Sequence, residues 1–444
     1  MNALTPFALD SGKPQKIAVI GSGISGSSAA WALSRNHEVT LFEGASRFGG
    51  HTATVDIDYG GTPISVDTGF IVYNTLNYPL LTKLFSELDV ETLDSDMSFS
   101  LSLDGGKLEW SGDSLSTVFA QRKNLVSPSF LWMLKDVLRF NSQCIVDRAS
   151  GYCDAITIGQ YLVKRKYSDV FRDNYLIPMS AAIWSTPRIK MLDFPARTFI
   201  DFFANHRLIN QDRPQWRTVK GGSRNYLGKL LGALGANAFC NAPVKAITRD
   251  ETGVSVTVEG RVAEPFDQVV IATHSDQALK MLADADDNEH KILGDVAYGP
   301  NRVVLHRDPT LMPKNKKCWT SWNALRSSKD GDENTISLTY WMNRLQSIDR
   351  SKPLFVSLNP IHEPKAELTF GEWAFEHPLF DLGAIDAQNN LAKIQGKRRT
   401  WFAGAWTKYG FHEDGLRSGL DVARALNSPA PFDDILEAAR LAAQ

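Results

Sequence analysis

Three glycines and a glutamate near the start of the chain have the types and the spacing that can hold a dinucleotide. Gly21, Gly23 and Gly26 follow an apolar run, and the next apolar run leads directly into a glutamate. The first glycine permits a tight turn, the second lets the backbone approach a pyrophosphate, and the third lets the following helix pack closely on the strand. The carboxylate of Glu43 is predicted to accept a hydrogen bond from a ribose 2′-hydroxyl, whereas it would repel a 2′-phosphate.

These residues require a strand, a helix and a second strand in that order. Residues 17–20 and 39–42 are apolar and favour buried strands, while residues 25–34 favour a helix. Ser25 lies in the first turn of this helix, where free amide groups and the positive end of the helix dipole attract phosphate. The sequence therefore predicts a Rossmann-like α/β unit that binds an adenine dinucleotide.

The segment after the glutamate indicates which dinucleotide the chain binds. Residues 43–51 are Glu-Gly-Ala-Ser-Arg-Phe-Gly-Gly-His, which resembles the segment that extends the nucleotide fold along FAD in the amine oxidase, protoporphyrinogen oxidase and phytoene desaturase superfamily. The resemblance implies backbone contacts to FAD from Gly49 and Gly50. His51 stands where the superfamily usually has arginine, and it is also a predicted cofactor contact. Arg47 either offers its guanidinium to a phosphate or is a solvated loop cation.

Three segments in the middle of the chain resemble the same superfamily. Residues 216–222 resemble its paired-glycine turn before a helix. Residues 241–247 resemble the strand whose backbone clamps the adenine, with Val244 as the predicted contact. Residues 254–258 alternate in polarity as a hairpin partner would. Residues 266–274 resemble the buried strand that returns beneath the cofactor.

The end of the chain resembles the strand, loop and helix that close over the flavin ring in this superfamily. The matching residues are 400–406 and 412–423. The resemblance implies that Gly404 lets the strand approach the ribityl chain or the pyrophosphate. It also implies that a helix opening near Gly415 and Leu416 stabilises negative charge on the reduced flavin through backbone amides.

The matching pieces lie at the beginning, middle and end of the chain, which predicts a discontinuous cofactor domain. Two interleaved domains also suit a chain of 444 residues. The predicted fold class is α/β, with a Rossmann-like FAD-binding domain of the glutathione-reductase and amine-oxidase type and an interleaved α+β substrate domain. The predicted boundaries are 14–80, 215–298 and 388–430 for the FAD-binding domain, 81–214 and 299–387 for the substrate domain, 1–13 for a disordered lead-in and 431–444 for a C-terminal helix.

Composition excludes several other classes of protein. Hydrophobic residues make up 43% of the chain and charged residues 22%, and the formal net charge of −2 with a pI near 6.5 gives no footprint for nucleic acid. The four cysteines are scattered, without a metal-type pair or a disulfide framework, so free thiols in the cytoplasm are expected and no metal site is predicted. No apolar run approaches the roughly 18 residues of a membrane-spanning helix.

One segment of the predicted substrate domain is both apolar and charged. Residues 129–140 are rich in large apolar groups but include Lys135, Asp136 and Arg139, which predicts an amphipathic helix with a broad apolar face. Such a helix either packs on its own domain or forms a surface that enters a membrane interface and admits a lipid substrate. The second alternative would bring a cytoplasmic protein into peripheral contact with the inner face of the membrane.

The chemistry that FAD supplies limits what the protein side chains have to do in the reaction. A hydride can pass from a substrate carbon to flavin N5 if the protein positions that carbon and removes water, so a catalytic side chain is not obligatory. His412 could accept a proton near neutral pH, and a structural histidine is its alternative. No cysteine lies beside the closing motif, so the FAD is predicted to be noncovalent. The candidate assistants on the loop expected beside the flavin ring are His412, Lys408, Tyr409 and Trp406.

The substrate is predicted to be organic, because no second strand-linked glycine triplet is present to seat NAD(P)H. Electrons would then pass to oxygen, a quinone or a partner protein. Residues 67–74 and 409–415 resemble a bacterial group of NAD/FAD-binding proteins that often accompany cyclopropane-fatty-acyl-type lipid methyltransferases. This resemblance implies an FAD-dependent dehydrogenase or desaturase of a methylated or unsaturated lipid acyl chain, in modified or furan fatty acid formation. The alternatives are an amine or amino acid oxidase that releases hydrogen peroxide, and a flavin-containing lipid-binding or partner protein without turnover.

Overall fold

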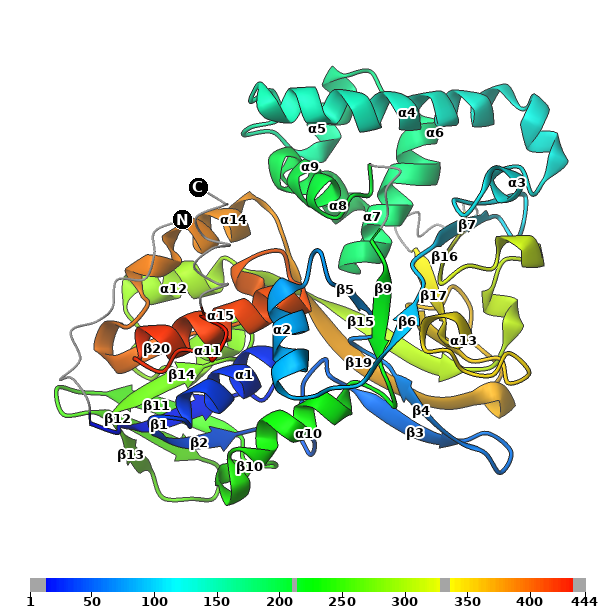
Figure 1. The fold of residues 1–444 in the computed structure, drawn as a ribbon. Helices are drawn as coiled ribbons and strands as arrows, with labels where there is room; N and C mark the ends of the chain where they lie inside the picture. Colours follow the sequence, from blue (N-terminus) through cyan, green and yellow to red (C-terminus); the bar gives the residue numbers. More distant parts are fainter. Residues whose placement is uncertain (1–12, 210–213, 328–335, 434–444) are drawn as a thin grey trace.

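The described residues of the computed structural model are 13–209, 214–327 and 336–433. They form a parallel sheet with its helices, a larger mixed sheet beside it, and a helical part at the outer edge (Figure 1). Within these residues, no helix is both long and apolar enough to cross a membrane. The four cysteines are free. Of the predicted lead-in only Lys13 is described, and most of the predicted C-terminal helix, residues 434–444, also lies outside the described residues.

A five-stranded parallel sheet holds the strands of the cofactor motifs. Its strand order is β10-β2-β1-β14-β20, and every neighbouring pair runs parallel. The residues of β14 are all buried, as expected for a parallel sheet covered on both faces. The strands predicted at 17–20 and 39–42 are confirmed. The strands are β1 (Lys16–Ile20), β2 (Glu38–Phe42), β10 (Ala238–Phe239), β14 (Gln268–Ile271) and β20 (Thr400–Phe402).

Two helices from opposite ends of the chain, α1 and α15, lie side by side against this sheet (Figure 1). Every residue of α1 is buried. A Cβ atom added at Gly419 would lie 2.2 Å from the carbonyl oxygen of Ser25, so only a glycine permits this close approach. The helices around the sheet are α1 (Ile24–Leu33), α10 (Arg224–Gly232), α11 (Ser275–Met281), α12 (Asp287–Gly294), α14 (Leu382–Asn390) and α15 (His412–Ala425).

A small antiparallel sheet completes the cofactor side. It consists of β11 (Val244–Arg249), β12 (Val254–Val258) and β13 (Glu264–Phe266). Val254, Val256 and Val258 are buried and the residues between them are not fully buried, which confirms the hairpin predicted from the alternating pattern.

A seven-stranded mixed sheet lies beside the parallel one. Its order is β19-β15-β18-β17-β16-β7-β8, and all neighbouring pairs are antiparallel except β16 and β7. Apart from the start of β15, its strands come from the two blocks predicted for the substrate domain. The strands are β7 (Phe99–Leu103), β8 (Leu108–Ser111), β15 (Ala297–His306), β16 (Trp322–Arg326), β17 (Ser337–Trp341), β18 (Phe355–Leu358) and β19 (Thr369–Leu379).

Short elements join the two sheets. Helix α2 crosses the predicted boundary at residue 80, because the carboxylate of Glu413 in α15 accepts the backbone N–H groups of Leu80 and Leu81 at 2.9 and 3.0 Å. These two hydrogen bonds hold the start of α2 against α15, on the cofactor side. The joining elements are the hairpin β3 (Thr54–Asp58) and β4 (Pro63–Asp67), the three-stranded sheet β5 (Tyr73–Asn74), β9 (Trp216–Val219) and β6 (Thr92–Ser95), and α2 (Pro79–Glu87).

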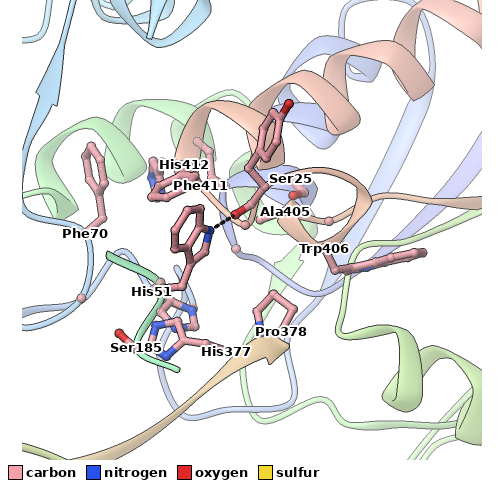
Figure 2. Close-up of a pocket in the computed structure, with 18 of the residues that line it drawn as sticks. Ser25, His51, Phe70, Ser185, His377, Pro378, Ala405, Trp406, Phe411 and His412 are labelled. Carbon is pink, nitrogen blue, oxygen red and sulfur yellow. Dashed lines mark hydrogen bonds between the residues drawn. The ribbon is translucent and has the colours of Figure 1, made fainter. Parts of the chain in front are cut away.

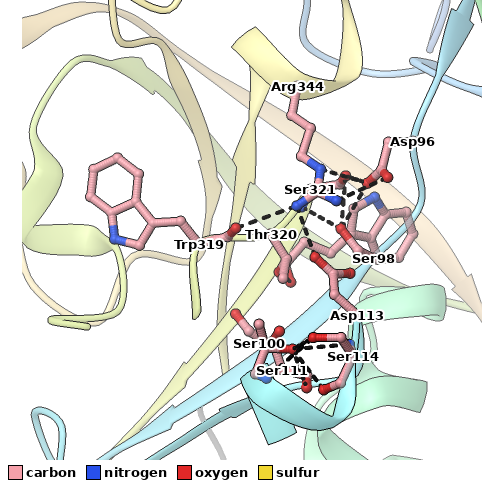
Figure 3. Close-up of polar contacts among 12 residues, drawn as sticks. Asp96, Ser98, Ser100, Ser111, Asp113, Ser114, Trp319, Thr320, Ser321 and Arg344 are labelled. Atoms are coloured by element: carbon pink, nitrogen blue, oxygen red, sulfur yellow. Dashed lines mark hydrogen bonds and ion pairs between the residues drawn. The ribbon is translucent and has the colours of Figure 1, made fainter. Parts of the chain in front are cut away.

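A polar network fixes the short helix α13 (Met342–Leu345) to the mixed sheet (Figure 3). The guanidinium of Arg344 contacts the carboxylates of Asp96 at 2.8 Å and Asp113 at 3.0 Å. Ser321 also donates to Asp96. These contacts hold the residue after α13, Gln346, where it can bond Asp67 in the joining hairpin.

The helical part packs around an aromatic core that includes Phe140, Phe171 and Phe203. The helix predicted at 129–140 is confirmed and is longer than predicted. The helices are α3 (Leu115–Val118), α4 (Pro128–Ala149), α5 (Ile158–Lys164), α6 (Asp169–Phe171), α7 (Ile177–Trp184), α8 (Arg188–Leu192) and α9 (Ala196–Asn205).

Candidate functional site

A cavity of about 430 Å³ lies between the two sheets. One side is formed by the glycine-rich turn after β1, the loop that follows β2, and the segment between β20 and α15. The other side is formed by the mixed sheet and by α7 and α9 of the helical part. Figure 2 shows side chains from both sides converging on this space. The cavity therefore joins the predicted cofactor site to a second, largely apolar space.

The glycine-rich turn has the shape that a pyrophosphate requires. A Cβ at Gly21, whose φ is +94°, would lie 2.8 Å from the carbonyl oxygen of Ala272, and a Cβ at Gly26 would lie 1.8 Å from the carbonyl oxygen of Gly21. A Cβ at Gly23 would meet nothing within 4 Å, and Gly23 lines the cavity. Two of the glycines are thus needed for packing, whereas Gly23 leaves open space beside the N-terminus of α1. Ser25, in the first turn of α1, also lines the cavity.

Glu43 lies at the end of β2 and lines the cavity beside this turn. Its carboxylate accepts hydrogen bonds from the N–H of Ser22 at 2.9 Å, the hydroxyl of Ser22 at 2.5 Å and the N–H of Ala45 at 2.9 Å. These bonds orient the carboxylate next to the turn. The position suits a ribose hydroxyl, which is the role predicted from the sequence.

Glu43→Ala is expected to lower FAD affinity by about tenfold, because it removes a charge-assisted hydrogen bond worth about 1.4 kcal/mol. Flavin fluorescence titration of the apoprotein measures the change. Glu38 is exposed at the other end of the same strand, so Glu38→Ala is the matched control. Equal affinities for Glu43→Ala and the unmodified protein would remove Glu43 from the site.

The second glycine loop lies against the first. Gly49 and Gly50 have φ values of +109° and +55°, and a Cβ at Gly50 would lie 3.3 Å from the Cα of Gly23. The guanidinium of Arg47 donates to the carbonyl oxygens of Gly50 at 2.7 Å and of Phe48 and Thr52 at 3.3 Å. Arg47 therefore holds the loop together and is absent from the residues that line the cavity. Its contact with a phosphate stays a prediction.

His51 lies in the cavity wall, in contact with His377 and Phe375 of β19. Burial holds the pKa of His51 well below the usual value, and the positive charge that His377 could carry adds to this effect. Its Nε2 atom is buried and has no hydrogen-bond partner among the described residues. The Nδ1 atom of His377 is 2.9 Å from the amide nitrogen of Asn301. Burial thus keeps the two imidazoles neutral at pH 7.

The helix at the end of the chain begins earlier than predicted. Helix α15 starts at His412, so the prediction that it opens near Gly415 and Leu416 is wrong by three residues. The N–H of Gly415 already donates to the carbonyl oxygen of Phe411 at 3.0 Å, and Leu416 is fully buried outside the cavity wall. The side chain of Asp414 accepts the N–H of Phe411 at 3.0 Å, which caps the helix at this point. The amides available to an anion are therefore those of the first turn, residues 412–414.

Two glycines of the closing motif allow close packing. A Cβ at Gly404 would lie 2.3 Å from the indole ring of Trp406, and both residues line the cavity. A Cβ at Gly415 would lie 2.7 Å from the side chain of Ile24 in α1. Gly404 thus lies where the predicted contact with the ribityl chain or pyrophosphate requires it, while Gly415 serves the contact between two helices.

His412 lies in the cavity wall with its ring stacked on Phe70 at a centroid distance of 3.8 Å (Figure 2). Its Nε2 atom is 2.5 Å from the hydroxyl of Tyr226, which in turn is 2.5 Å from the hydroxyl of Thr52. Burial lowers the pKa of His412 to about 3. The structure therefore describes a neutral imidazole held by a phenol, and proton transfer by His412 stays a prediction.

The other candidate assistants differ in position. Tyr409 and Trp406 line the cavity, and burial raises the pKa of Tyr409 to about 12. Lys408 is absent from the cavity wall, and its charge acts on Asp414. Val244, the predicted adenine contact, lies half-buried at the start of β11 and outside the cavity wall. The structure thus brings Tyr409 and Trp406 to the site and leaves Lys408 and Val244 beside it.

The substrate side of the wall was not predicted from the sequence. Phe70, Ile71 and Val72 lie three to five residues after Asp67, in a segment that the sequence singled out without giving it a role. The remaining apolar wall comes from α7, α9, the mixed sheet, β9, the loops beside these elements and the end of the segment that leads into α15. Its large side chains are Met97, Ile183, Trp184, Phe202, Leu208, Trp216, Trp322, Tyr340, Phe380 and Phe411. The signatures at residues 67–74 and 409–415 offered a sequence signal for part of this wall.

Buried histidines make stability depend on pH. Burial lowers the pKa of six described histidines: His51, His206, His274, His306, His377 and His412. As the pH falls below 6.5, the unfolded chain binds protons that these folded-state histidines do not, so the folded state loses stability. Three carboxyls oppose this effect, because burial raises the pKa of Glu413 to about 7 and those of Asp67 and Asp414 to about 6.

Since the histidines outnumber the carboxyls, the apoprotein is expected to melt at a lower temperature at pH 5 than at pH 7. Thermal unfolding followed by circular dichroism at the two pH values measures this difference. A melting temperature at pH 5 that equals or exceeds the value at pH 7 would show that the carboxyls dominate.

The sequence matches two known families at the two sides of this site. Residues 19–88 match the NAD(P)-binding Rossmann-like domain family, and residues 153–349 match the family of flavin containing amine oxidoreductases. The middle of the chain is therefore similar to flavin containing amine oxidoreductases, and its beginning is similar to Rossmann-like dinucleotide-binding domains. The resemblance inferred from the motifs is therefore confirmed, and so is the Rossmann-like α/β fold class.

Amine oxidases and a fatty acid isomerase are among the proteins that resemble this flavoprotein. AofH of Mycobacterium tuberculosis (strain ATCC 25618 / H37Rv), assigned as a flavin-containing monoamine oxidase, is 25% identical over 329 residues, which cover 70% of this chain and 63% of AofH. Putrescine oxidase bound to putrescine superposes with a TM-score of 0.66 at 16% identity, covering 93% of this chain and 99% of that protein. The fatty acid isomerase of P. acnes that produces CLA gives a TM-score of 0.65 at 15% identity, covering 92% and 98%. At these identities the two structures support the fold alone.

The cofactor of this flavoprotein is FAD, and the cavity fits it. Open space at Gly23, the N-terminus of α1 and the carboxylate of Glu43 suit the pyrophosphate and the ribose. His51, whose Nε2 atom has no partner among the described residues, and His412 at the start of α15 belong to the same wall. The flavin end would therefore lie between these groups and the apolar side of the cavity.

Proposed function

We propose that this flavoprotein is an FAD-dependent oxidoreductase that removes two hydrogen atoms from a methylated or unsaturated lipid acyl chain. The observation that carries the proposal is the apolar wall of the cavity, which is continuous with the cofactor site. Large aliphatic and aromatic side chains supply most of that wall, and such a surface binds hydrocarbon by removing it from water.

The charges in the wall favour a hydrocarbon over a cation. A protonated amine that enters a cavity is stabilised by a buried carboxylate or by an aromatic cage, and wall residues such as Trp184 and Trp322 could contribute to a cage. The carboxylates are what distinguish the two substrate classes here. Within the described residues, Glu43 and Glu376 are the carboxylates of the wall. Glu43 is bonded at the glycine turn, and Glu376 lies 3.6 Å from His274 with 52% of its side chain exposed. Neither carboxylate is buried on the apolar side.

A second cavity gives room for a long chain. It has a volume of about 440 Å³ and is lined by apolar residues such as Ala182 and Leu358 and by polar residues such as Asn301, from α7, the loop after it and the mixed sheet. Ser185, which follows α7, lines both cavities and is labelled in Figure 2. An acyl chain could thus extend from the flavin end past Ser185 into the second cavity.

The residues of the chain would position the substrate and keep water out. FAD, when bound, supplies the acceptor for the hydride. The apolar wall would hold a saturated carbon in contact with the cofactor, and the stacked pair of Phe70 and His412 would close the wall on one side. The substrate would lose one hydride to the cofactor and one proton to solvent, so the acyl chain gains one double bond.

Product analysis tests the proposal. The purified holoprotein is incubated in air with phospholipids that carry monounsaturated or methyl-branched chains, and the released fatty acids are examined by mass spectrometry. The proposal predicts a product lighter by two hydrogen atoms. A product of unchanged mass with a shifted double bond would indicate an isomerase, and no lipid product would contradict the proposal.

An amine or amino acid oxidase is the second candidate function. It is supported by the similarity to AofH and by Glu376 in the wall. Hydrogen peroxide release with an amine, and none with a lipid, would establish this alternative. A flavin-containing lipid-binding protein would bind the lipid without either product.

A further inference from the structure

The exposed apolar side chains of this protein gather in one part of the fold. Of the 14 exposed large hydrophobic side chains among the described residues, 11 lie between residues 115 and 189. These residues belong to the helical part, which lies at the outer edge of the molecule, away from the parallel sheet (Figure 1). A surface patch of this kind marks a site of interaction, because scattered exposure would spread over the whole chain.

Helix α4 carries the centre of this patch. Leu131, Leu138 and Ile145 are exposed and follow one another at intervals of seven residues, which places them on one face of the helix. Trp132 and Val146 lie beside them, with 54% and 60% of their surfaces exposed. We call this set the α4 face.

The opposite side of α4 packs in the core. Phe130, Met133, Phe140 and Cys144 are buried there. One side of the helix thus packs on its own domain, as one interpretation of the sequence expected. A second apolar side of the same helix is exposed. Packing within the domain does not explain why the apolar side chains of the α4 face are exposed.

The segment that leads into α4 extends the patch. Leu125 and Val126 belong to the short helical turn Arg122–Val126, which packs against the start of α4, and 80% of the surface of Val126 is exposed. Leu115 in α3 and Val163 in α5 are also exposed in the helical part. Apolar groups are therefore available beyond the single helix.

The charge of this region is opposite to that of the whole chain. Residues 115–190 contain eleven Lys and Arg against five Asp and Glu, whereas the whole chain carries a formal net charge of −2. Asp136 and Asp147, two of those five acidic residues, are buried. Lys123, Lys135 and Lys166 are exposed. The helical part therefore carries an excess of positive charge, and one of its exposed lysines, Lys135, lies on α4 beside Trp132.

We propose that the α4 face binds the surface of an anionic lipid bilayer. Lys135 lies 4.3 Å from the ring of Trp132, an arrangement that suits a membrane interface, where the indole enters the headgroup region and the ammonium stays beside the phosphates. An exposed apolar helix side with cations around it is the pattern of proteins that lie on a bilayer. A protein partner would not require the excess of positive charge. This binding is independent of the proposed reaction, because it requires neither turnover nor an acyl chain in the cavity.

Cosedimentation of the full-length holoprotein with vesicles tests the proposal. The vesicles contain either phosphatidylcholine alone or an equal mixture of phosphatidylcholine and phosphatidylglycerol. The unmodified protein is expected to bind the anionic vesicles, and added salt is expected to weaken this binding. Trp132→Asp and Leu138→Asp are each expected to lower the affinity by about tenfold. Both side chains are exposed, so flavin content and melting temperature should match those of the unmodified protein.

Val262→Asp is the matched control. Val262 is 88% exposed in the turn between β12 and β13 on the cofactor side, and its replacement is expected to leave vesicle binding unchanged. Equal binding of Leu138→Asp and the unmodified protein would overturn the proposal. So would a failure of the unmodified protein to bind anionic vesicles. If light scattering then showed a dimer that Leu138→Asp converts to a monomer, the α4 face would be the contact between two copies of this chain.

Discussion

Gly23→Leu is expected to abolish the retention of FAD while the chain still folds. A Cβ at Gly23 meets no atom within 4 Å, and the backbone there, with φ of −58° and ψ of 176°, suits any residue. The leucine side chain would instead fill the part of the cavity that the pyrophosphate needs. A steric cost of about 3 kcal/mol corresponds to a loss of affinity of about 100-fold. The absorbance spectrum of the purified variant and a flavin titration measure this loss.

The control for this variant is Gly228→Leu. Gly228 lies on the exposed side of α10, and a Cβ there also meets no atom within 4 Å, so the substitution adds the same side chain outside the cavity. Gly228→Leu should keep its yellow colour. A Gly23→Leu protein with a full flavin spectrum would contradict the position assigned to the pyrophosphate.

Asp67→Ala is expected to destabilise the protein by about 3 kcal/mol. The carboxylate of Asp67 is buried and accepts hydrogen bonds from the hydroxyl of Thr54 at 2.6 Å, the N–H of Ser223 at 2.9 Å and the side-chain amide of Gln346 at 3.0 Å. These donors would lose their acceptor in a buried place, which costs more than the bonds themselves contribute. Chemical denaturation followed by circular dichroism measures the free energy of unfolding.

The loss of this acceptor should also affect the cavity, because Asp67 immediately precedes the wall residues 69–72. Asp67→Asn keeps one acceptor oxygen and the shape of the side chain, so it should lose less stability than Asp67→Ala. Asp56→Ala is the control on the same hairpin. Asp56 is exposed and pairs with Arg224, and an exposed ion pair contributes less than about 1 kcal/mol. Similar losses for Asp67→Ala and Asp56→Ala would contradict the role given to Asp67.

The cofactor side could be predicted from the sequence because its signals are local. The glycines at 21, 23 and 26 act through backbone geometry at fixed spacing. The strands β1 and β2 are short apolar runs, which in an α/β fold favour buried strands of the sheet. Resemblance to a known superfamily then identified FAD and joined the separated blocks. These features required no knowledge of tertiary contacts.

The start of α15 was misplaced for a physical reason. The helix was predicted to open near Gly415, whereas Gly415 lies within the first turns of the helix, where a Cβ would collide with Ile24 of α1. The cap that sets the true start is formed by the side chain of Asp414 with the N–H of Phe411. A glycine needed for helix packing cannot be distinguished by its type from a glycine needed for a cofactor.

The apolar wall could not be predicted because its residues come from distant segments. Phe70, Trp184 and Trp322 lie in three different parts of the chain and meet only through the pairing of the sheets and the position of α7. In the sequence they have the same character as core residues. The same holds for the α4 face, since a pattern of apolar and charged residues does not tell which side of the helix is covered.

The most direct test of this account is an anaerobic absorbance spectrum of the purified protein, recorded before and after the addition of phospholipids with monounsaturated or methyl-branched chains. A panel of amines is added to a parallel sample. The account predicts a flavin spectrum at the start and bleaching of the visible band by the lipid, with no change from the amines. Bleaching by an amine alone would assign the protein as an amine oxidase. A purified protein that carries no flavin and cannot be reconstituted with FAD would contradict the account from its first step.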